Sequence, residues 1–163
     1  MNAAGTHPSV VSAPDGYRPC VGIVLRCPAG VFAGERRGCP GAWQMPQGGI
    51  DLGESVREAA LRELREETSV PSDAVKVVEE TADWLSYDFP SEIQATRWGG
   101  RFRGQAQKWV LMEFLGAEHL IDLATDEPEF DAWQWMSPGA LVAAIVDFKR
   151  PTYVEVFDAL GLG

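Results

Sequence analysis

One segment, from Gly48 to Val70, constrains the fold of this chain more than any other because it predicts a short helix rich in carboxylates. Ser55 is followed three residues later by Glu58, which is the spacing of a capping box. In such a box the two side chains bond the free backbone N–H groups at the start of a helix. The spacing therefore predicts a helix that begins at Ser55 and runs to about Thr68.

The glutamates of this helix share its apolar face. At about 100° per residue, one narrow arc contains Glu63, Glu66, Glu67, Val56, Ala59 and Ala60. The other side of the helix carries, on it or toward it, Arg57, Glu58, Arg62 and Arg65. A charged run on a helix is usually a solvated face, but carboxylates that continue an inward-facing arc repel one another and lose hydration. A protein tolerates this mainly where a cation lies between them.

The ligand chemistry indicates a hard divalent cation. The candidate ligands are carboxylate oxygens, and no histidine or cysteine is near them in the sequence. Ligation by oxygen alone favours Mg2+ or Mn2+ over Zn2+. The sequence therefore predicts a magnesium or manganese site on this helix.

The same segment resembles the Nudix box: a glycine, five residues, a glutamate, seven residues, then Arg-Glu-aliphatic-x-Glu-Glu-x-Gly-aliphatic. The matching positions are Gly48, Glu54, Arg62, Glu63, Leu64, Glu66, Glu67 and Val70. Ser69 departs from the pattern, because the family has a glycine there that closes the helix in a left-handed conformation. Serine at this position is expected to cost ~1 kcal/mol of stability without removing a metal ligand.

Length and composition indicate one soluble domain. The chain has 163 residues, of which 45% are hydrophobic, so it can bury a sizeable core. It contains no apolar run that approaches the roughly 18 residues of a membrane span. Residues 1–16 lack the basic start and apolar core of a secretory signal. We therefore expect a flexible tail over residues 1–16, a domain over residues 17–163, and a cytoplasmic location.

Charge and cysteine content narrow the expected partners. The net charge of −10 argues against broad, nonspecific binding of nucleic acid, although it leaves room for a local basic pocket. Cys20, Cys27 and Cys39 are odd in number and lack metal-binding spacing, so we expect reduced thiols. We expect no membrane partner, no DNA partner, and a monomer.

The order of predicted elements favours the α/β class. Strands are predicted over residues 20–26, 31–36, 42–45, 107–116 and 132–136, the first two as a hairpin. Between them we expect a turn over residues 46–49, a strand with an irregular connection from residue 75, and a charged loop over residues 91–104. Prolines near a first turn predict helices over residues 138–146 and 151–160. The strand and helix order suggests layered α/β packing, which the resemblance sharpens to a Nudix α/β/α sandwich with a mixed central sheet.

The resemblance extends to one branch of the family, the bacterial RNA pyrophosphohydrolases and dinucleoside polyphosphate hydrolases. The matching blocks are GYRPCVGIVL from Gly16, WQMPQGGI from Trp43, WLSYDFP from Trp84, GQAQKW from Gly104, PEFDAWQW from Pro128 and DFKRPTY from Asp147. Two positions depart from the branch. Ala42 stands where relatives have a serine near the phosphates, and Asp147 replaces a serine beside the base pocket. The added negative charge is expected to weaken the binding of a polyanion such as RNA.

The resemblance implies roles for individual residues. Two or three Mg2+ ions are expected on Glu63, Glu66 and Glu67, with Glu129 and the carbonyl of Gly48 completing the site. The 5′ phosphates are expected on Arg18, Arg37 and Lys108, and the nucleobase in a pocket of Val146, Phe148 and Lys149. Glu54 and Arg62 are expected to brace the loop and the helix. Glu66, Glu67 or Glu129 is expected to accept the proton of the attacking water as the general base, and the sequence does not choose among the three.

Three functions compete. The first is removal of pyrophosphate from the 5′ end of triphosphorylated RNA. The second is hydrolysis of dinucleoside polyphosphates such as diadenosine tetraphosphate at the same site. The third is a noncatalytic nucleotide-sensing module, which degenerate carboxylates would favour. Glu63, Glu66 and Glu67 are all present, so the sequence favours an enzyme.

Overall fold

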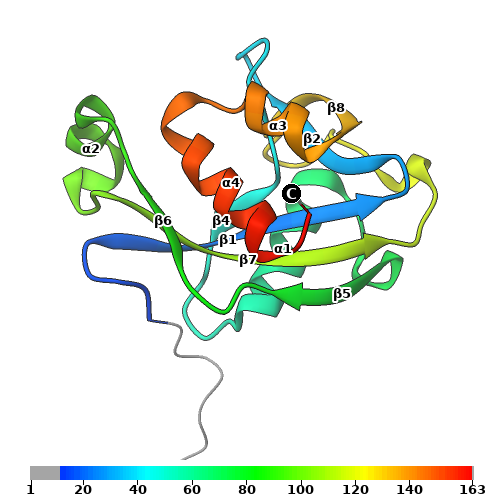
Figure 1. Ribbon diagram of the computed structural model, residues 1–163, viewed down its shortest axis with the longest axis horizontal. Coiled ribbons are helices and arrows are strands. Elements are labelled where there is room, and N and C mark those ends of the chain that lie inside the picture. The colour runs from blue at the N-terminus through cyan, green and yellow to red at the C-terminus, as the bar shows by residue number, and fades with distance from the viewer. Residues whose placement is uncertain (1–11, 163) are drawn as a thin grey trace, which may run out of the picture.

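The computed structural model describes residues 12–162, which fold as one mixed sheet between helices (Figure 1). Its strands are β1 (Tyr17–Cys27), β2 (Gly30–Arg36), β3 (Trp43–Gln44), β4 (Gln47–Gly49), β5 (Val75–Glu80), β6 (Leu85–Asp88), β7 (Gly104–Phe114) and β8 (Phe130–Met136). Its α-helices are α1 (Val56–Thr68), α2 (Ser91–Thr96), α3 (Pro138–Ala144) and α4 (Arg150–Ala159). Short 3₁₀ turns are η1 (Ser72–Ala74), η2 (Arg97–Gly100), η3 (Glu118–Leu120) and η4 (Asp147–Lys149).

The sheet is built on one parallel pair of long strands. β1 and β7 run parallel from the pair Tyr17 and Gly104 to the pair Arg26 and Glu113. The strand order is β3-β2-β1-β7-β5, with β4 also paired to β1, β6 to β7 and β8 to β2. These other pairs are all antiparallel. The sheet is therefore mixed, as expected.

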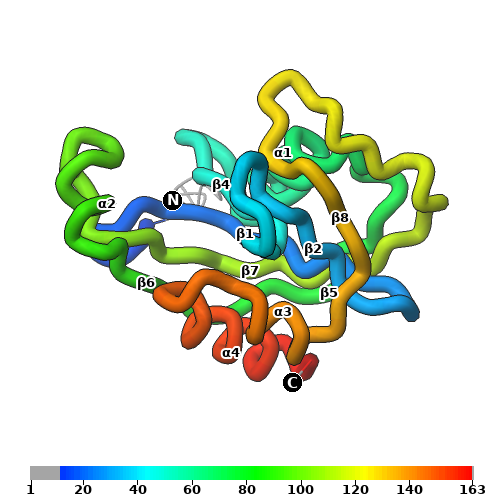
Figure 2. Tube along the Cα trace, turned by 90° about the horizontal axis from the view of Figure 1, so that it is seen from above, coloured from blue at the N-terminus to red at the C-terminus, as the bar shows by residue number. Residues whose placement is uncertain are grey.

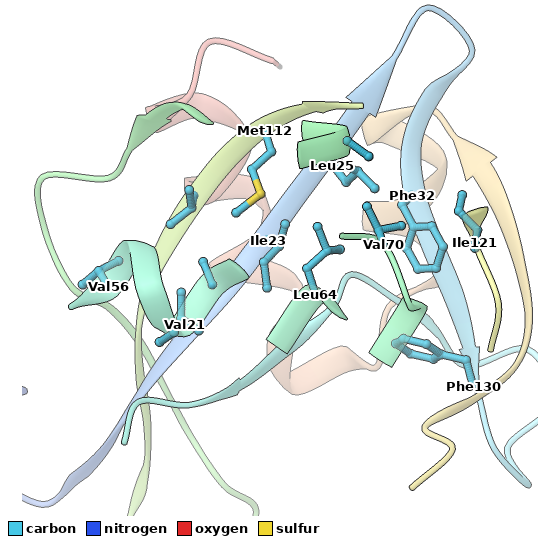
Figure 3. Close-up of a cluster of buried hydrophobic side chains, with 14 residues drawn as sticks. Val21, Ile23, Leu25, Phe32, Val56, Leu64, Val70, Met112, Ile121 and Phe130 are labelled. Carbon is cyan, nitrogen blue, oxygen red and sulfur yellow. The ribbon is translucent and has the colours of Figure 1, made fainter. Parts of the chain in front are cut away.

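Helices cover both faces of the sheet, which gives the expected α/β/α layers. Figure 2 shows α1 on one side of the central strands and α3 with α4 on the other. The first core lies between the sheet and α1, and Figure 3 shows Leu64 of the helix among Val21 and Ile23 of β1. The second core lies under α3 and α4, where Trp109 of β7 meets Tyr153 of α4 edge to face. Strand side chains alternate between the two faces, so β1 contributes to both cores.

Both ends of α1 follow from its sequence. The Ser55 hydroxyl accepts a hydrogen bond from the backbone N–H of Glu58 at 3.1 Å, and the Glu58 carboxylate accepts one from the N–H of Ser55 at 3.4 Å. The predicted capping box is therefore confirmed. Ser69 ends the helix with a φ of 67°, the left-handed conformation that the family's glycine adopts. Its hydroxyl donates a 2.7 Å hydrogen bond to the carbonyl of Asp122, which offsets part of the strain.

Two predicted connections are wrong. Residues 46–49, predicted as a turn, contain the strand β4, because backbone pairing with β1 orders a Gly-Gly segment of weak intrinsic propensity. Residues 91–104, predicted as a charged loop, contain α2 and η2, with Pro90 just before the helix. The helix predicted to reach residue 146 ends at Ala144, and the strand predicted over 107–116 is β7, which begins and ends earlier.

The predicted N-terminal tail lies mostly outside the described residues. Only residues 12–16 of it are described, and Tyr17 then begins β1. Within residues 12–162, no helix has both the length and the apolar character needed to cross a bilayer.

Candidate active site

The glutamates of α1 line a cleft that lies between the helix and the segment leading into β8. The cleft has a volume of about 860 Å3. It is lined by Glu63, Arg65, Glu66, Glu67, Ser69, Ala124, Thr125, Asp126, Glu127 and Glu129. The structure thus brings the three helix glutamates together with Glu129, which is more than sixty residues away in the sequence. Asp126 and Glu127 also line it, and only their closeness to Glu129 in the sequence could have indicated this.

The carboxylates of the cleft are poorly compensated. Glu67 is buried, and its carboxylate accepts a 3.3 Å hydrogen bond from the backbone N–H of Gln47. Burial, together with the negative charges of Glu63 and Glu129, raises the pKa of Glu67 well above its ordinary value. Burial also raises the pKa of Glu63, against the opposing effect of Arg62. A bound cation would stabilise both carboxylates.

Gly48 lets the sheet approach this cluster. It pairs with Val21 of β1, and its missing side chain points at Glu63. A Cβ atom at this position would overlap the Glu63 carboxylate, so only glycine fits without a shift. The close approach leaves the Gly48 backbone beside the carboxylate cluster, while the role of its carbonyl as a metal ligand stays a prediction.

Arg62 braces the site, although the helical wheel placed it toward the other side. Its guanidinium donates to both oxygens of Glu54 at 2.7 and 2.8 Å and to the carbonyl of Gly49 at 2.8 Å. It also contacts Glu63 at 2.7 Å and Glu66 at 3.2 Å. The length of the arginine side chain carries its charge around the helix, which a wheel of Cα positions does not represent. The hydrogen bond from Arg62 lowers the pKa of Glu54.

The carboxylate oxygens of the cleft are of the chemical type that a hard divalent cation prefers. They are not, however, arranged around one common point. Among residues 12–162, no three acidic, histidine or cysteine side chains are grouped closely enough to form a ready-made metal site. Like charges without a cation between them keep apart, and Arg62 and the Gln47 N–H each take up one carboxylate. The oxygen-only composition and the buried Glu67 support the predicted class of metal.

The opposite face of β4 is basic. Gly49 pairs with Cys20, and a Cβ atom on Gly49 would overlap the guanidinium of Arg18. That guanidinium also donates to the Sγ of Cys20 at 3.3 Å. Burial raises the pKa of the Cys20 thiol to about 11, so this cysteine is a neutral neighbour and not a nucleophile.

The predicted base-pocket residues are partly brought together. Lys149 is buried, with its ammonium 5.5 Å from the ring centre of Tyr87 and 5.9 Å from that of Phe148. Tyr87 was not predicted, and its ring centre lies 5.7 Å from that of Phe148. Val146 is 40% exposed at the end of the segment before η4. Desolvation, with the nearby charges of Arg36 and Arg97, lowers the pKa of Lys149 to about 8.

Two predicted phosphate ligands, Arg37 and Lys108, make contacts with parts of the protein other than the base-pocket residues. The Arg37 side chain is exposed, while its backbone N–H bonds the carbonyl of Glu129 at 2.9 Å. The Lys108 ammonium donates to the carbonyls of Thr81 and Ala82 and faces the Trp84 ring. Their roles as phosphate ligands stay predictions.

Two buried, hydrogen-bonded glutamines of β7 were missed. The Gln107 amide donates to the side-chain carbonyl of Gln47 at 2.8 Å, and the Tyr87 hydroxyl donates to that of Gln105 at 2.6 Å. Gln105 and Gln107 are buried on β7. Polar residues at buried positions of a strand were the available signal, because such groups need partners.

Known proteins are similar to this chain in sequence and in architecture. Residues 16–156 match the family model described as NUDIX domain. The RNA pyrophosphohydrolase of Dinoroseobacter shibae is 54% identical over 145 residues, which cover 88% of this chain and 91% of that protein. Nudix hydrolase 26, chloroplastic, of Arabidopsis thaliana is 45% identical over 158 residues, which cover 93% of this chain and 72% of that protein.

Solved structures agree on the fold. The E. coli dihydroneopterin triphosphate pyrophosphohydrolase superposes with a TM-score of 0.66 at 18% identity, covering 89% of this chain and 98% of that one. A C. elegans Ap4A hydrolase binary complex gives a TM-score of 0.63 at 18% identity, covering 88% of this chain and 98% of that one. At such identities the likeness concerns architecture only. The matched length, the box on α1 and the layered sheet together place this chain in the Nudix family.

Proposed function

We propose that this chain is a metal-dependent RNA pyrophosphohydrolase that removes pyrophosphate from the 5′ end of triphosphorylated RNA. The observation that carries the proposal is the presence of opposite charges on the two faces of β4: the carboxylate cleft lies on one side and Arg18 on the other. A polyphosphate chain with its divalent cation satisfies both. The name RNA pyrophosphohydrolase, borne by the relative from Dinoroseobacter shibae at 54% identity, supports the choice of substrate.

The residues of the cleft divide the work. When bound, Mg2+ or Mn2+ supplies positive charge to phosphate oxygens and Lewis acidity toward water. Glu63, Glu66 and Glu67 would hold it with Glu129 and the carbonyl of Gly48, while Glu54 fixes Arg62 behind them.

Glu129 is the proposed acceptor of the proton from the attacking water. Glu66 is bonded to Arg62 and Glu67 to the Gln47 N–H. Within the described part of the chain, the Glu129 carboxylate has no such partner among the protein's donors, so it is available. Arg18, Arg37 and Lys108 are proposed to bind the phosphates, and Val146, Phe148 and Lys149 the nucleobase.

Hydrolysis of dinucleoside polyphosphates is the second candidate. The net charge of −10 favours a small substrate over a long polyanion. The expected repulsion of RNA by Asp147 is weaker than its charge alone suggests, because Arg150 pairs with it at 2.8 Å.

A comparison of the two substrates tests the proposal. Values of kcat/KM are measured for 5′-triphosphate RNA and for diadenosine tetraphosphate at matched Mg2+, in the wild type, Lys149→Ala and Asp147→Ser. We expect the wild type to prefer RNA, Lys149→Ala to lose more on RNA, and Asp147→Ser to gain on RNA. Preference for the dinucleotide, with equal losses in Lys149→Ala and no gain in Asp147→Ser, would favour the second candidate.

The metal requirement is tested in the same assay. We expect no turnover in excess chelator and recovery with Mg2+ or Mn2+. Ca2+ is larger and accepts looser geometry, so it is expected to inhibit. Full activity in excess chelator would contradict the metal site.

A further inference from the structure

Trp98 occupies an unusual position beside the basic side of the site. It lies in η2, within the small lobe formed by α2 and η2, and it has a φ of 50°. A bulky residue rarely adopts this left-handed conformation unless its surroundings hold it there. Its ring stacks on Phe89, with centroids 5.4 Å apart and planes at 24°. The lobe thus holds Trp98 in a strained backbone conformation on an aromatic support.

The ring of Trp98 supports Arg18. The guanidinium carbon of Arg18 lies 4.7 Å from the ring centroid, which is cation–π distance. Arg18 is half-buried, and among residues 12–162 no carboxylate lies within ion-pair distance of it. Its other contacts are the Cys20 thiol and the close approach of Gly49.

The base of the lobe is fixed to β1 near Arg18. The Tyr17 hydroxyl donates to Asp88 at 2.5 Å, and Arg103 pairs with the same carboxylate at 2.7 Å. The backbone N–H of Arg103 also bonds the carbonyl of Gly16 at 2.9 Å. These contacts hold the lobe next to β1, the strand that carries Arg18. The position of Trp98 over Arg18 is therefore fixed both by the stacking on Phe89 within the lobe and by the attachment of the lobe to β1.

This arrangement suits a phosphate ligand. A carboxylate partner would occupy the N–H donors of a guanidinium, whereas an aromatic ring attracts its flat face and leaves the N–H groups in its plane free. An arginine ordered in this way also loses less side-chain entropy when a phosphate binds.

We propose that Trp98 is a positioning residue that holds Arg18 in the orientation in which it binds the phosphate chain of the substrate. The inference rests on the proposed function only in that Arg18 binds phosphate. Trp98 acts through Arg18 and needs no contact with the substrate. The α2–η2 lobe thereby becomes part of the binding site.

A double-mutant cycle tests the inference. KM and kcat for 5′-triphosphate RNA, and the inhibition constant of inorganic tripolyphosphate, are measured for Trp98→Leu, Arg18→Ala and the double variant. We expect Trp98→Leu to raise KM and the inhibition constant roughly 3- to 10-fold, as expected for loss of a partly solvated cation–π contact, with kcat within about 2-fold. In the Arg18→Ala background, Trp98→Leu should add less than about 2-fold.

Two further variants separate positioning from general loosening of the lobe. Trp98→Phe keeps an aromatic face and should recover most of the affinity. Gln94→Ala removes the hydrogen bond that the Gln94 amide donates to the carbonyl of Phe89 at 2.8 Å, which loosens the lobe while leaving the Trp98 ring in place, and should change KM by less than about 2-fold. Multiplicative effects in the double variant, no recovery in Trp98→Phe, or an equal effect of Gln94→Ala would each overturn the inference.

Failure of the proposed function has a different signature. If RNA is not the substrate, the wild type will not turn over 5′-triphosphate RNA. The coupling between Trp98 and Arg18 then still appears in the inhibition constant of tripolyphosphate measured against diadenosine tetraphosphate turnover.

Discussion

Gly48 and Gly49 are adjacent in β4, yet they face opposite sides of the sheet. Gly48 faces a side with excess negative charge, and Gly49 faces a side with excess positive charge. Gly48 faces crowded carboxylates, where burial raises the pKa of Glu67 well above normal. Gly49 faces Arg18 on the side of the sheet where desolvation lowers the pKa of Lys149 to about 8. On the acidic side Arg62 pairs with Glu63 and Glu66 but not with Glu67 or Glu129, and on the basic side neither Arg18 nor Lys149 forms an ion pair within the described residues.

The contrast shows how a short strand without side chains can serve two kinds of chemistry. Two consecutive glycines let a carboxylate and a guanidinium each approach the same backbone from opposite faces. The protein's own contacts leave part of the charge on each side without a partner, so each side favours a ligand of opposite charge. The predictions below change one side at a time.

The largest effect is expected on the acidic side. Glu67→Gln should lower kcat by about 10³-fold or more, the scale associated with losing a charged catalytic group. Its melting temperature should not fall, because the amide removes a desolvated negative charge. Activity assays in Mg2+ and thermal denaturation check this, with the exposed Glu79→Gln as a control that should retain activity. Retention of more than a tenth of wild-type activity would exclude the assigned role.

Arg62→Ala removes the brace from the same side. It leaves Glu54 and Glu63 without their charged donor, which should cost about 2 to 3 kcal/mol in free energy of unfolding. Urea denaturation measures this cost. Arg57→Ala, on the exposed part of the same helix, is the matched control and should change stability by less than about 0.5 kcal/mol. Similar losses in both variants would show that removal of an arginine from α1 in general, and not loss of the brace, explains the effect.

Lys149 tests the basic side through pH. Its pKa of about 8 in the folded protein lies below the ordinary lysine pKa of 10.5 that applies in the unfolded chain, so the unfolded chain binds more protons between these two pH values. The cost of the buried ammonium is therefore full below pH 8 and fades as pH rises toward 10.5. Lys149→Met should be more stable than the wild type at pH 7 by on the order of 2 kcal/mol, and this gap should shrink by pH 10.

Urea denaturation at pH 7 and pH 10 measures the gap. The exposed Lys76→Met is the control, and its difference from the wild type should not change with pH. A gap for Lys149→Met that stays constant or widens would mean that the amine is not desolvated.

The smallest effect concerns Ser69 at the edge of the acidic cleft. Ser69→Ala keeps the left-handed strain and loses the hydrogen bond to Asp122, so it should destabilise the protein by about 1 kcal/mol. Ser69→Gly loses the same bond but relieves the strain, and should lie within about 0.5 kcal/mol of the wild type. Thermal denaturation ranks the three proteins, and equal losses in both variants would show that the strain is negligible.

The sequence predicted most reliably what depends on local spacing. The capping box at Ser55, the left-handed position at Ser69 and the burial of Glu67 all follow from contacts within a few residues. Glu66, predicted on the same inward arc, is exposed, because it lies at the solvent edge of that arc, where Arg62 contacts it. The strand β4 could not be predicted in this way, because its order comes from pairing with β1. The grouping of Glu129 with the helix glutamates came from family resemblance, since nothing local specifies it.

Side-chain reach explains the remaining differences. Arg62 spans from the outer flank of α1 to Glu63 and Glu54, which a wheel of Cα positions could not show. The cation–π contact of Arg18 with Trp98 joins two segments about eighty residues apart and depends on the fold of the α2–η2 lobe. The sequence offered only the residue types.

The parallel pairing of β1 with β7 also determines when the site can form during folding. Arg26 of β1 contacts Glu113 of β7 across 87 residues of sequence, and the closure of so long a loop carries an entropic cost that local contacts do not share. Helix α1 and strand β4 lie within that loop. They can therefore form from local contacts before the complete sheet is available for them to pack against. On the ribosome, the chain must be synthesised past Glu129 before the cleft that this residue lines together with the helix glutamates is complete.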